Sequence, residues 1–118
     1  MSLDVYLKYP IDTRGDEVDP SFHEVFTANI THNLAEMARA LGCYDACWHP
    51  ERLSSDPRAH HIKPYLKEAL MELAENPKKY RKYESENGWG TTDGFERFLM
   101  GYVIACLKYP NANVEACV

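Results

Sequence analysis

Hydrophobic and polar positions alternate near both ends of the chain and follow helical spacing between them. Residues 3–9 alternate with a period of two, as in a half-buried strand, and the alternation stops at Pro10. A polar loop at 11–21 follows, and residues 22–28 then recover apolar character and predict a second strand. Residues 113–118 alternate again, so we expect them to pair with the first strand.

Helical periodicity predicts three main helices between these strands. Residues 31–41 place apolar side chains at i, i+3, i+4 and i+7, with Thr31 as the expected N-cap and Gly42 as the stop. Further apolar stripes predict a helix over residues 57–75 and a last helix over residues 92–108. The last helix is apolar on more than one side, which indicates a central position in the fold.

The segment at 43–56 shows no regular period, and we expect it to be irregular apart from one turn around residues 48–51. With 118 residues and 45% hydrophobic composition, the chain can bury one core, whereas a second domain would be undersized. Strands at the ends and helices between them predict an α+β fold. We therefore expect residues 1–118 to form a single small domain, in which three main helices pack on a short antiparallel sheet from the N- and C-terminal strands.

Charge and the length of apolar stretches limit the classes of partner. The chain has 13 Lys and Arg residues against 18 Asp and Glu residues, and its formal charge of −5 repels a phosphate backbone. Nucleic acid is therefore not the expected partner, although residues 78–83 mix basic and aromatic side chains. The apolar stretch at 98–107 is shorter than the ~20 residues that span a bilayer, and the N-terminus does not resemble a secretory signal. We expect no membrane contact and a location in a reducing cytoplasm.

Cysteines and histidines do not form a recognisable metal motif. We expect the cysteines to stay reduced and to act as small core residues; they are Cys43, Cys47, Cys106 and Cys117. A four-cysteine zinc site normally shows two close pairs, and the sequence has one. His32 and Glu36 have the i, i+4 spacing of two metal ligands on one helical face, but no His-Glu-x-x-His motif accompanies them. We therefore expect no metal and no other cofactor.

The segment 28–33, ANITHN, concentrates hydrogen-bonding side chains at the predicted start of a helix. On a helix, one polar stripe opposite the apolar face would be formed by Asn29, His32, Asn33 and Glu36. One polar residue would be enough for a cap, so the excess indicates a ligand site that also includes Thr31. A structural interpretation stays open, in which Thr31 caps the helix and the other polar side chains are solvated or form a local turn.

The segment 87–91, NGWGT, is the second candidate for ligand contacts. Its two glycines relax the steric limits on the backbone around Trp89, whose indole would then lie against a planar ligand. Backbone amides of the turn and of the helix start near Thr91 are able to meet an anion, and Asn87 offers a paired donor and acceptor. The alternative is an ordinary Asn-Gly turn that places Trp89 in the core.

Three motifs together resemble a widespread family of small, uncharacterised proteins of phages and prophages. The motifs are ANITHNL at 28–34, W-x-P-E at 48–51 and ENGWGT at 86–91. DVYL at 4–7 adds to the likeness, which spans most of the chain. The chain departs from the family pattern at His49, where many relatives have Arg. The resemblance implies a phage-encoded protein.

Phage origin, a small acidic chain and polar and aromatic groups around one predicted pocket favour a small-molecule-binding protein. The chain is similar in general character to viral sponge proteins, which bind nucleotide immune signals of the host without altering them. We expect a nucleotide-like ligand, sequestration as an anti-defence function, and a homo-oligomer that covers surplus apolar surface. The expected ligand contacts are Asn29, Thr31, His32, Asn33, Trp48, Asn87, Trp89 and Thr91.

Two other classes of function stay open. A nucleotide-cleaving hydrolase would use His32 as acid or base, with Glu36 as its orienting partner. A protein-binding inhibitor or adaptor would present Trp48 and Trp89 as exposed anchors. The sequence shows no nucleophile motif, metal set or carboxylate pair, so we expect a binding protein without catalytic residues rather than an enzyme.

Overall fold

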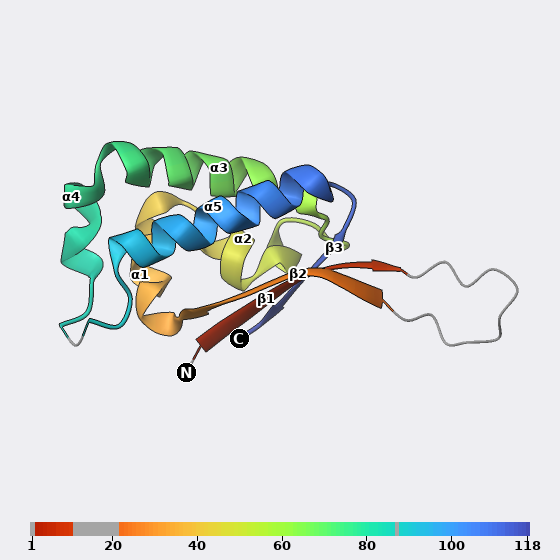
Figure 1. Ribbon diagram of the computed structural model, residues 1–118, viewed down its shortest axis with the longest axis horizontal. Coiled ribbons are helices and arrows are strands. Elements are labelled where there is room, and N and C mark those ends of the chain that lie inside the picture. The colour runs from red at the N-terminus through yellow and green to blue at the C-terminus, as the bar shows by residue number, and fades with distance from the viewer. Residues whose placement is uncertain (1, 11–21, 87) are drawn as a thin grey trace, which may run out of the picture.

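Three antiparallel strands form one sheet in the order β2-β1-β3 (Figure 1). The computed structural model describes residues 2–10, 22–86 and 88–118. The strands are β1 (Ser2–Pro10), β2 (Phe22–Thr31) and β3 (Asn113–Cys117). The central strand β1 pairs with β2 along one edge and with β3 along the other. The predicted sheet from the N- and C-terminal segments is therefore confirmed.

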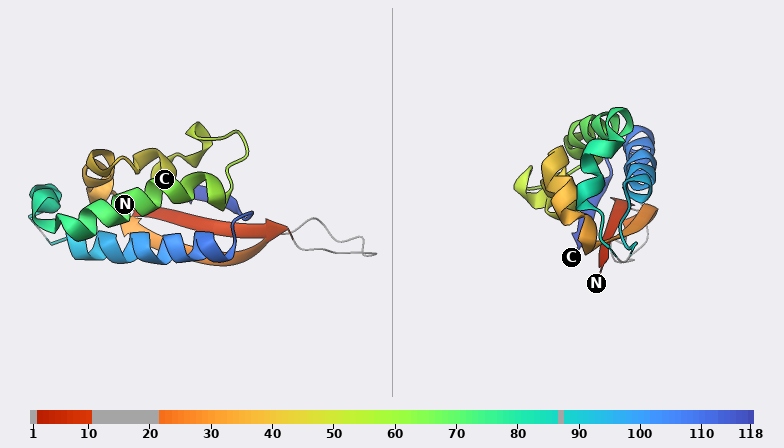
Figure 2. Two further views of the ribbon diagram at one scale, coloured as in Figure 1. Left: turned by 90° about the horizontal axis from the view of Figure 1, so that it is seen from above. Right: turned by 90° about the vertical axis from the view of Figure 1, so that its left-hand side faces the viewer.

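The register of the sheet separates an apolar face from a polar one. Leu3, Val5 and Leu7 of β1 are fully buried, because successive side chains of a strand point to opposite faces and these three share the core face. On the other face, Lys8 pairs with Glu115 of β3. Among the described elements, the helices gather on one side of the sheet, as Figures 1 and 2 show.

The chain between β2 and β3 is mostly helical, and the three predicted main helices are present. The first begins as a 3-10 turn; the segments are η1 (His32–Leu34) with α1 (Ala35–Leu41), α3 (Ala59–Glu75) and α5 (Thr92–Lys108). The segment expected to be irregular contains two short helices, α2 (Tyr44–Trp48) and η2 (Pro50–Arg52). A further turn follows α3 as α4 (Pro77–Tyr80) and η3 (Arg81–Tyr83). No helix in the part of the chain that the structure describes has both the length and the apolarity to cross a bilayer.

The predicted cap Thr31 and stop Gly42 are found at the expected helix ends, and Thr91 caps the last helix. Thr31 caps η1, since its Oγ1 accepts a hydrogen bond from the Asn33 amide at 3.3 Å. Gly42 ends α1 at φ 79°, a left-handed conformation that glycine adopts without steric cost. Thr91 caps α5, where its Oγ1 accepts a hydrogen bond from the Gly94 amide at 3.0 Å. Each end therefore has its own chemical cause in the sequence.

The core lies between the sheet and the two long helices. α3 and α5 run side by side over the sheet (Figures 1 and 2). Their large buried side chains include Ile62, Leu66, Leu73, Phe95, Leu99 and Tyr102. Full burial of a large apolar side chain contributes about 1.5–3 kcal/mol, so this layer contributes substantially to the stability of the fold.

The four free thiols differ in exposure, which predicts their reactivity. Cys43, Cys47 and Cys106 are buried as predicted, whereas Cys117 on β3 is exposed, so the prediction of a core position is wrong for Cys117. Burial raises the pKa of Cys106 to about 12, so this thiol stays protonated and unreactive at neutral pH.

A chromogenic disulfide reagent should titrate one thiol rapidly in the native protein and four after unfolding. Cys117→Ser should remove the fast phase, and a second fast thiol in the native protein would contradict the packing.

Tyr102 on α5 buries a hydroxyl that has no hydrogen-bond partner among the described residues. Its ring stacks on Phe26 of β2 with centroids 5.4 Å apart, so burial of the ring is favourable while the unpaired hydroxyl costs about 1–3 kcal/mol. Tyr102→Phe should raise the free energy of unfolding by about 1 kcal/mol in urea denaturation.

Tyr80→Phe is the matched control for this change. The Tyr80 hydroxyl donates a hydrogen bond to Glu72 Oε1 at 3.0 Å, so its removal should lower the free energy of unfolding by about 1 kcal/mol. If Tyr102→Phe lowered the free energy of unfolding as Tyr80→Phe does, the Tyr102 hydroxyl would have a partner.

Candidate functional site

The segment 28–33 leaves the sheet as a strand before it becomes helical. β2 continues to Thr31, and Asn29 lies opposite Asp4 of β1, where Asn29 Nδ2 donates a hydrogen bond to Asp4 Oδ1 at 2.6 Å. The predicted helical stripe is therefore wrong for Asn29. Pairing with β1 extends the strand past the point where the local periodicity becomes helical, and this long-range contact is not visible in the local pattern.

His32 and Trp48 form a polar link between η1 and α2. Trp48 is 2% exposed, and its Nε1–H donates a hydrogen bond to His32 Nδ1 at 3.0 Å. The Trp48 ring also stacks on Tyr44, with centroids 5.4 Å apart and an interplanar angle of 14°. A buried indole is favourable when its N–H has an acceptor. Trp48 is thus part of the core, with little surface left for the ligand contact that the sequence predicted.

The two candidate motifs meet at the Trp89 loop. Asn33 Nδ2 donates a hydrogen bond to the backbone carbonyl oxygen of Trp89 at 3.3 Å, and Ser85 Oγ donates to the same oxygen at 2.6 Å. Gly90, at φ 99°, packs so closely that an added Cβ would lie 3.1 Å from Thr31 Cγ2. The indole of Trp89 is 67% exposed. The structure thus brings the two segments into direct contact, with the indole at the surface rather than in the core.

Thr91 and Asn87 complete the set of predicted ligand contacts. Thr91 caps α5, and Glu84 Oε2 accepts hydrogen bonds from the Thr92 amide at 2.6 Å and the Thr92 hydroxyl at 3.0 Å. A carboxylate of the protein therefore occupies the helix start where an anion was expected. Asn87 lies outside the described residues. Direct contact between a ligand and this set stays a prediction.

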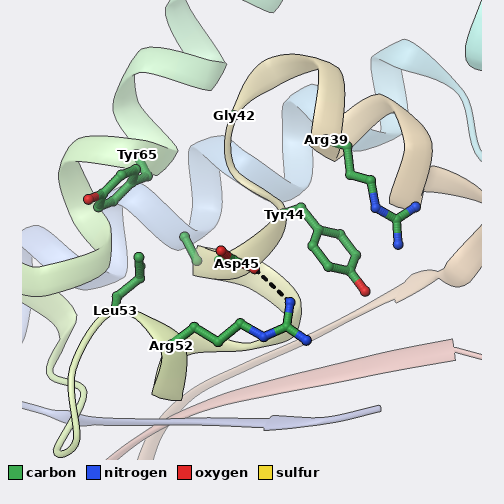
Figure 3. A pocket seen from close by; sticks show the side chains of 8 residues that line it. Arg39, Gly42, Tyr44, Asp45, Arg52, Leu53 and Tyr65 are labelled. Carbon is green, nitrogen blue, oxygen red and sulfur yellow. Dashed lines mark hydrogen bonds and ion pairs between the residues drawn. The ribbon is translucent and has the colours of Figure 1, made fainter.

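A cavity of about 450 Å³ opens on another part of the surface, beside α1 and α2 (Figure 3). Its volume falls within the range of about 300–1,000 Å³ that is typical of small-molecule sites. The elements α1, α2, η2 and α3 supply most of its walls. The lining residues are Arg39, Gly42, Tyr44, Asp45, Ala46, Arg52, Leu53 and Tyr65.

Two guanidinium groups give this cavity a cationic side. Arg52 on η2 binds Asp45 on α2, with Nη1 and Oδ1 3.1 Å apart. Arg39 on α1 pairs with Glu36, and its Cζ lies 4.1 Å from the centroid of the Tyr44 ring. Exposed ion pairs of this kind contribute only about 0–1 kcal/mol. Breaking either ion pair, so that the guanidinium group is free for an anionic ligand, therefore costs little.

An aromatic and apolar surface lies at the other side of the cavity. Figure 3 shows Tyr65 and Leu53 on one side of Asp45 and Tyr44 on the other. Tyr65 on α3 is 43% exposed, so its ring is accessible to a ligand, whereas Arg39 already lies over the Tyr44 ring. The cavity thus offers donors for an anion at one end and a planar surface at the other.

A second cavity, of about 490 Å³, lies where β3 meets the start of α3. Arg58 there binds Asp56 Oδ2 through Nε at 3.1 Å and Nη2 at 2.8 Å, and Lys8 pairs with Glu115. None of its described lining residues is aromatic. This cavity has paired charges but no stacking surface, so the cavity beside α1 and α2 is the better candidate for a planar anionic ligand.

The sequence did not identify the residues of the better candidate. Arg39 falls on the polar side of a predicted helix, and Tyr65 falls within another, where charged and aromatic residues are common. The nearest signal is the W-x-P-E motif at 48–51, which lies between Asp45 and Arg52 in the chain. The convergence of four elements depends on the tertiary fold and has no local pattern.

Neither metal chemistry nor known relatives add to this picture. Within the ranges that the structure describes, no group of three or more His, Cys, Asp and Glu side chains is placed to hold a metal ion. Comparisons with family models, curated proteins and solved structures give no match. The geometry and chemistry of the cavity are therefore the basis for inferring a function.

His32→Ala should destabilise the fold, because it leaves the buried N–H of Trp48 without an acceptor. Such an unpaired donor costs about 1–3 kcal/mol of the free energy of unfolding, which urea denaturation measures. His60→Ala is the same change at an exposed position of α3, and we expect an effect below about 0.5 kcal/mol.

A double variant separates the hydrogen bond from other effects of removing His32. In a Trp48→Phe background the indole N–H is absent, so His32→Ala should lower the free energy of unfolding by less than it does in the wild type. Equal costs in the two backgrounds would show that the hydrogen bond does not contribute to stability.

Proposed function

We propose that this protein binds a nucleotide-like small molecule in the cavity between α1, α2, η2 and α3 and holds it without altering it. The observation that supports this most directly is the combination of Arg39 and Arg52 with the accessible ring of Tyr65 around one cavity. A nucleotide has the matching chemistry, because its phosphate and its planar base lie at opposite ends. Arginine binds phosphate through forked N–H donors, and an aromatic ring provides a surface for stacking.

A small nucleotide fits this protein better than a nucleic acid strand. The cavity of about 450 Å³ has room for a small molecule. The formal charge of −5 repels a long phosphate backbone, whereas the two arginines attract one anionic group locally. Size and charge therefore favour the same class of ligand.

A nucleotide-cleaving enzyme has less support. His32, the expected acid or base, accepts a hydrogen bond from Trp48. Glu36, its expected orienting partner, pairs with Arg39 instead. The residues that line the cavity include no histidine, cysteine or serine, and their one carboxylate, Asp45, is paired with Arg52. Binding without cleavage is the simpler use of this set of side chains.

A protein-binding adaptor is the other alternative, and it needs exposed aromatic anchors. Trp89 is exposed and meets this requirement, whereas Trp48 is buried. One of the two expected anchors is therefore accessible. This alternative predicts a protein partner at the Trp89 loop and no nucleotide in the cavity.

Sequestration of a nucleotide-derived immune signal in the host cytoplasm is the biological role that we propose for this binding. It is supported by the resemblance to phage proteins and by the general likeness to sponge proteins that hold such signals intact. A homo-oligomer belongs to the same proposal. Exposed apolar side chains of α5 are surface that a second copy would cover; they are Met100, Ile104 and Leu107.

Titration calorimetry with AMP, ADP-ribose and cyclic dinucleotides tests the binding. We expect AMP and at least one larger nucleotide to bind, and Arg52→Ala to weaken the binding about tenfold or more, because a charge-assisted contact with phosphate is lost. Arg97→Ala is the matched control, because it removes an exposed arginine from α5, across the helical layer from α1 (Figure 2). This variant should bind the nucleotides with the affinity of the wild type.

The fate of the ligand separates the three classes of function. Heating the complex and analysing the released material by chromatography should recover the nucleotide intact. An altered product would establish catalysis instead. Absence of nucleotide binding, together with a host protein that co-purifies, would support the adaptor.

A further inference from the structure

Asp45 lies between the two ends of the candidate cavity. In Figure 3 its carboxylate stands between the Tyr65 and Leu53 side and the Tyr44 side. Its Oδ1 accepts a hydrogen bond from Arg52 Nη1 at 3.1 Å, and its side chain is 45% exposed. Within the described part of the chain, this carboxylate makes no other hydrogen bond. Asp45 therefore retains acceptor capacity that faces the cavity.

We propose that Asp45 makes this cavity selective for ribonucleotides by accepting hydrogen bonds from the ribose hydroxyl groups. This inference rests on the proposed function and specifies its ligand. In a nucleotide the sugar lies between the base and the phosphate, and in the cavity Asp45 lies between the Tyr65 surface and the guanidinium groups. An ionised carboxylate is an acceptor with two oxygens, which suits two neighbouring hydroxyl donors. Acidic residues bind ribose hydroxyl groups in the same way in dinucleotide-binding folds.

The charge of Asp45 gives an independent reason for a contact with the sugar. A carboxylate beside an anion site repels phosphate, and Arg52 offsets this repulsion only in part because the pair is exposed to water. A ribonucleotide compensates for the repulsion through its hydroxyl groups. A 2′-deoxynucleotide meets the same repulsion and lacks one of the two donors, so it binds less tightly.

Glu36 provides a contrast within the same region. It pairs with Arg39 but does not line the cavity. Its carboxylate binds the Arg39 guanidinium group from outside the cavity, so it is not placed to contact a sugar inside. The proposed selectivity therefore belongs to Asp45, although both arginines have an acidic partner.

Calorimetry of the full chain with AMP and 2′-deoxy-AMP tests the proposal. The wild type should bind AMP about tenfold more tightly than 2′-deoxy-AMP, the effect of one hydrogen bond to a charged group. Asp45→Ala should bring the ratio of the two affinities close to one. The same variant should bind 2′-deoxy-AMP more tightly than the wild type does, because the repulsion of the phosphate is removed.

Two further variants complete the design. Asp45→Asn removes the charge and keeps one acceptor oxygen. Its ratio of the affinities for AMP and 2′-deoxy-AMP should therefore fall between those of the wild type and Asp45→Ala. Asp56→Ala releases Arg58 at the second cavity in the same way and should leave both affinities unchanged. Circular dichroism of each variant verifies that the fold is kept. The comparison of AMP with 2′-deoxy-AMP on the wild-type protein tests the proposal even if a variant fails to fold.

The outcomes distinguish this inference from the proposed function. If AMP does not bind, both are wrong. If AMP binds and the wild type shows no preference over 2′-deoxy-AMP, only the inference is overturned. A preference that persists unchanged in Asp45→Ala would also overturn it, because the discrimination would then come from another residue.

Discussion

The hydrogen bond from the buried Trp48 indole to His32 positions both the end of β2 and the candidate cavity. The indole N–H must find an acceptor when the ring enters the core, and His32 is that acceptor. This bond fixes η1 relative to α2. The ring of Trp48 stacks on Tyr44, and Arg39 lies over Tyr44 in turn. The burial of Trp48 is therefore linked through Tyr44 to Arg39 on the cationic side of the cavity.

The polar side chains at the end of β2 make several contacts of this kind within the protein. Asn29 reaches across to β1, and Thr31 caps the first helical turn. His32 receives the Trp48 N–H, and Asn33 holds the backbone of the Trp89 loop. Each side chain connects a different pair of elements, so the polar excess that suggests a ligand site also forms a network within the protein. Networks of this kind fix one arrangement of the elements when their groups are satisfied.

Local signals in the sequence predict the long helices well and the cavity poorly. α3 and α5 have apolar stripes within their own segments, and Pro77 marks the end of α3. β2 extends beyond its predicted end because β1 pairs with it, and α2 forms where tertiary contacts bury Trp48. The cavity requires four elements to converge, and the sequence specifies the residue types but not their meeting point.

We propose that an anionic, planar ligand enters the cavity beside α1 and α2 and competes there with carboxylates that are only weakly held. An NMR titration of isotope-labelled protein with AMP, following backbone amides and arginine Nε–H groups, tests it most directly. We predict that the largest shifts fall within residues 39–53 and at Tyr65, and that the Nε–H signals of Arg39 and Arg52 move. Largest shifts within residues 85–91 instead would place the ligand at the Trp89 loop and contradict this account.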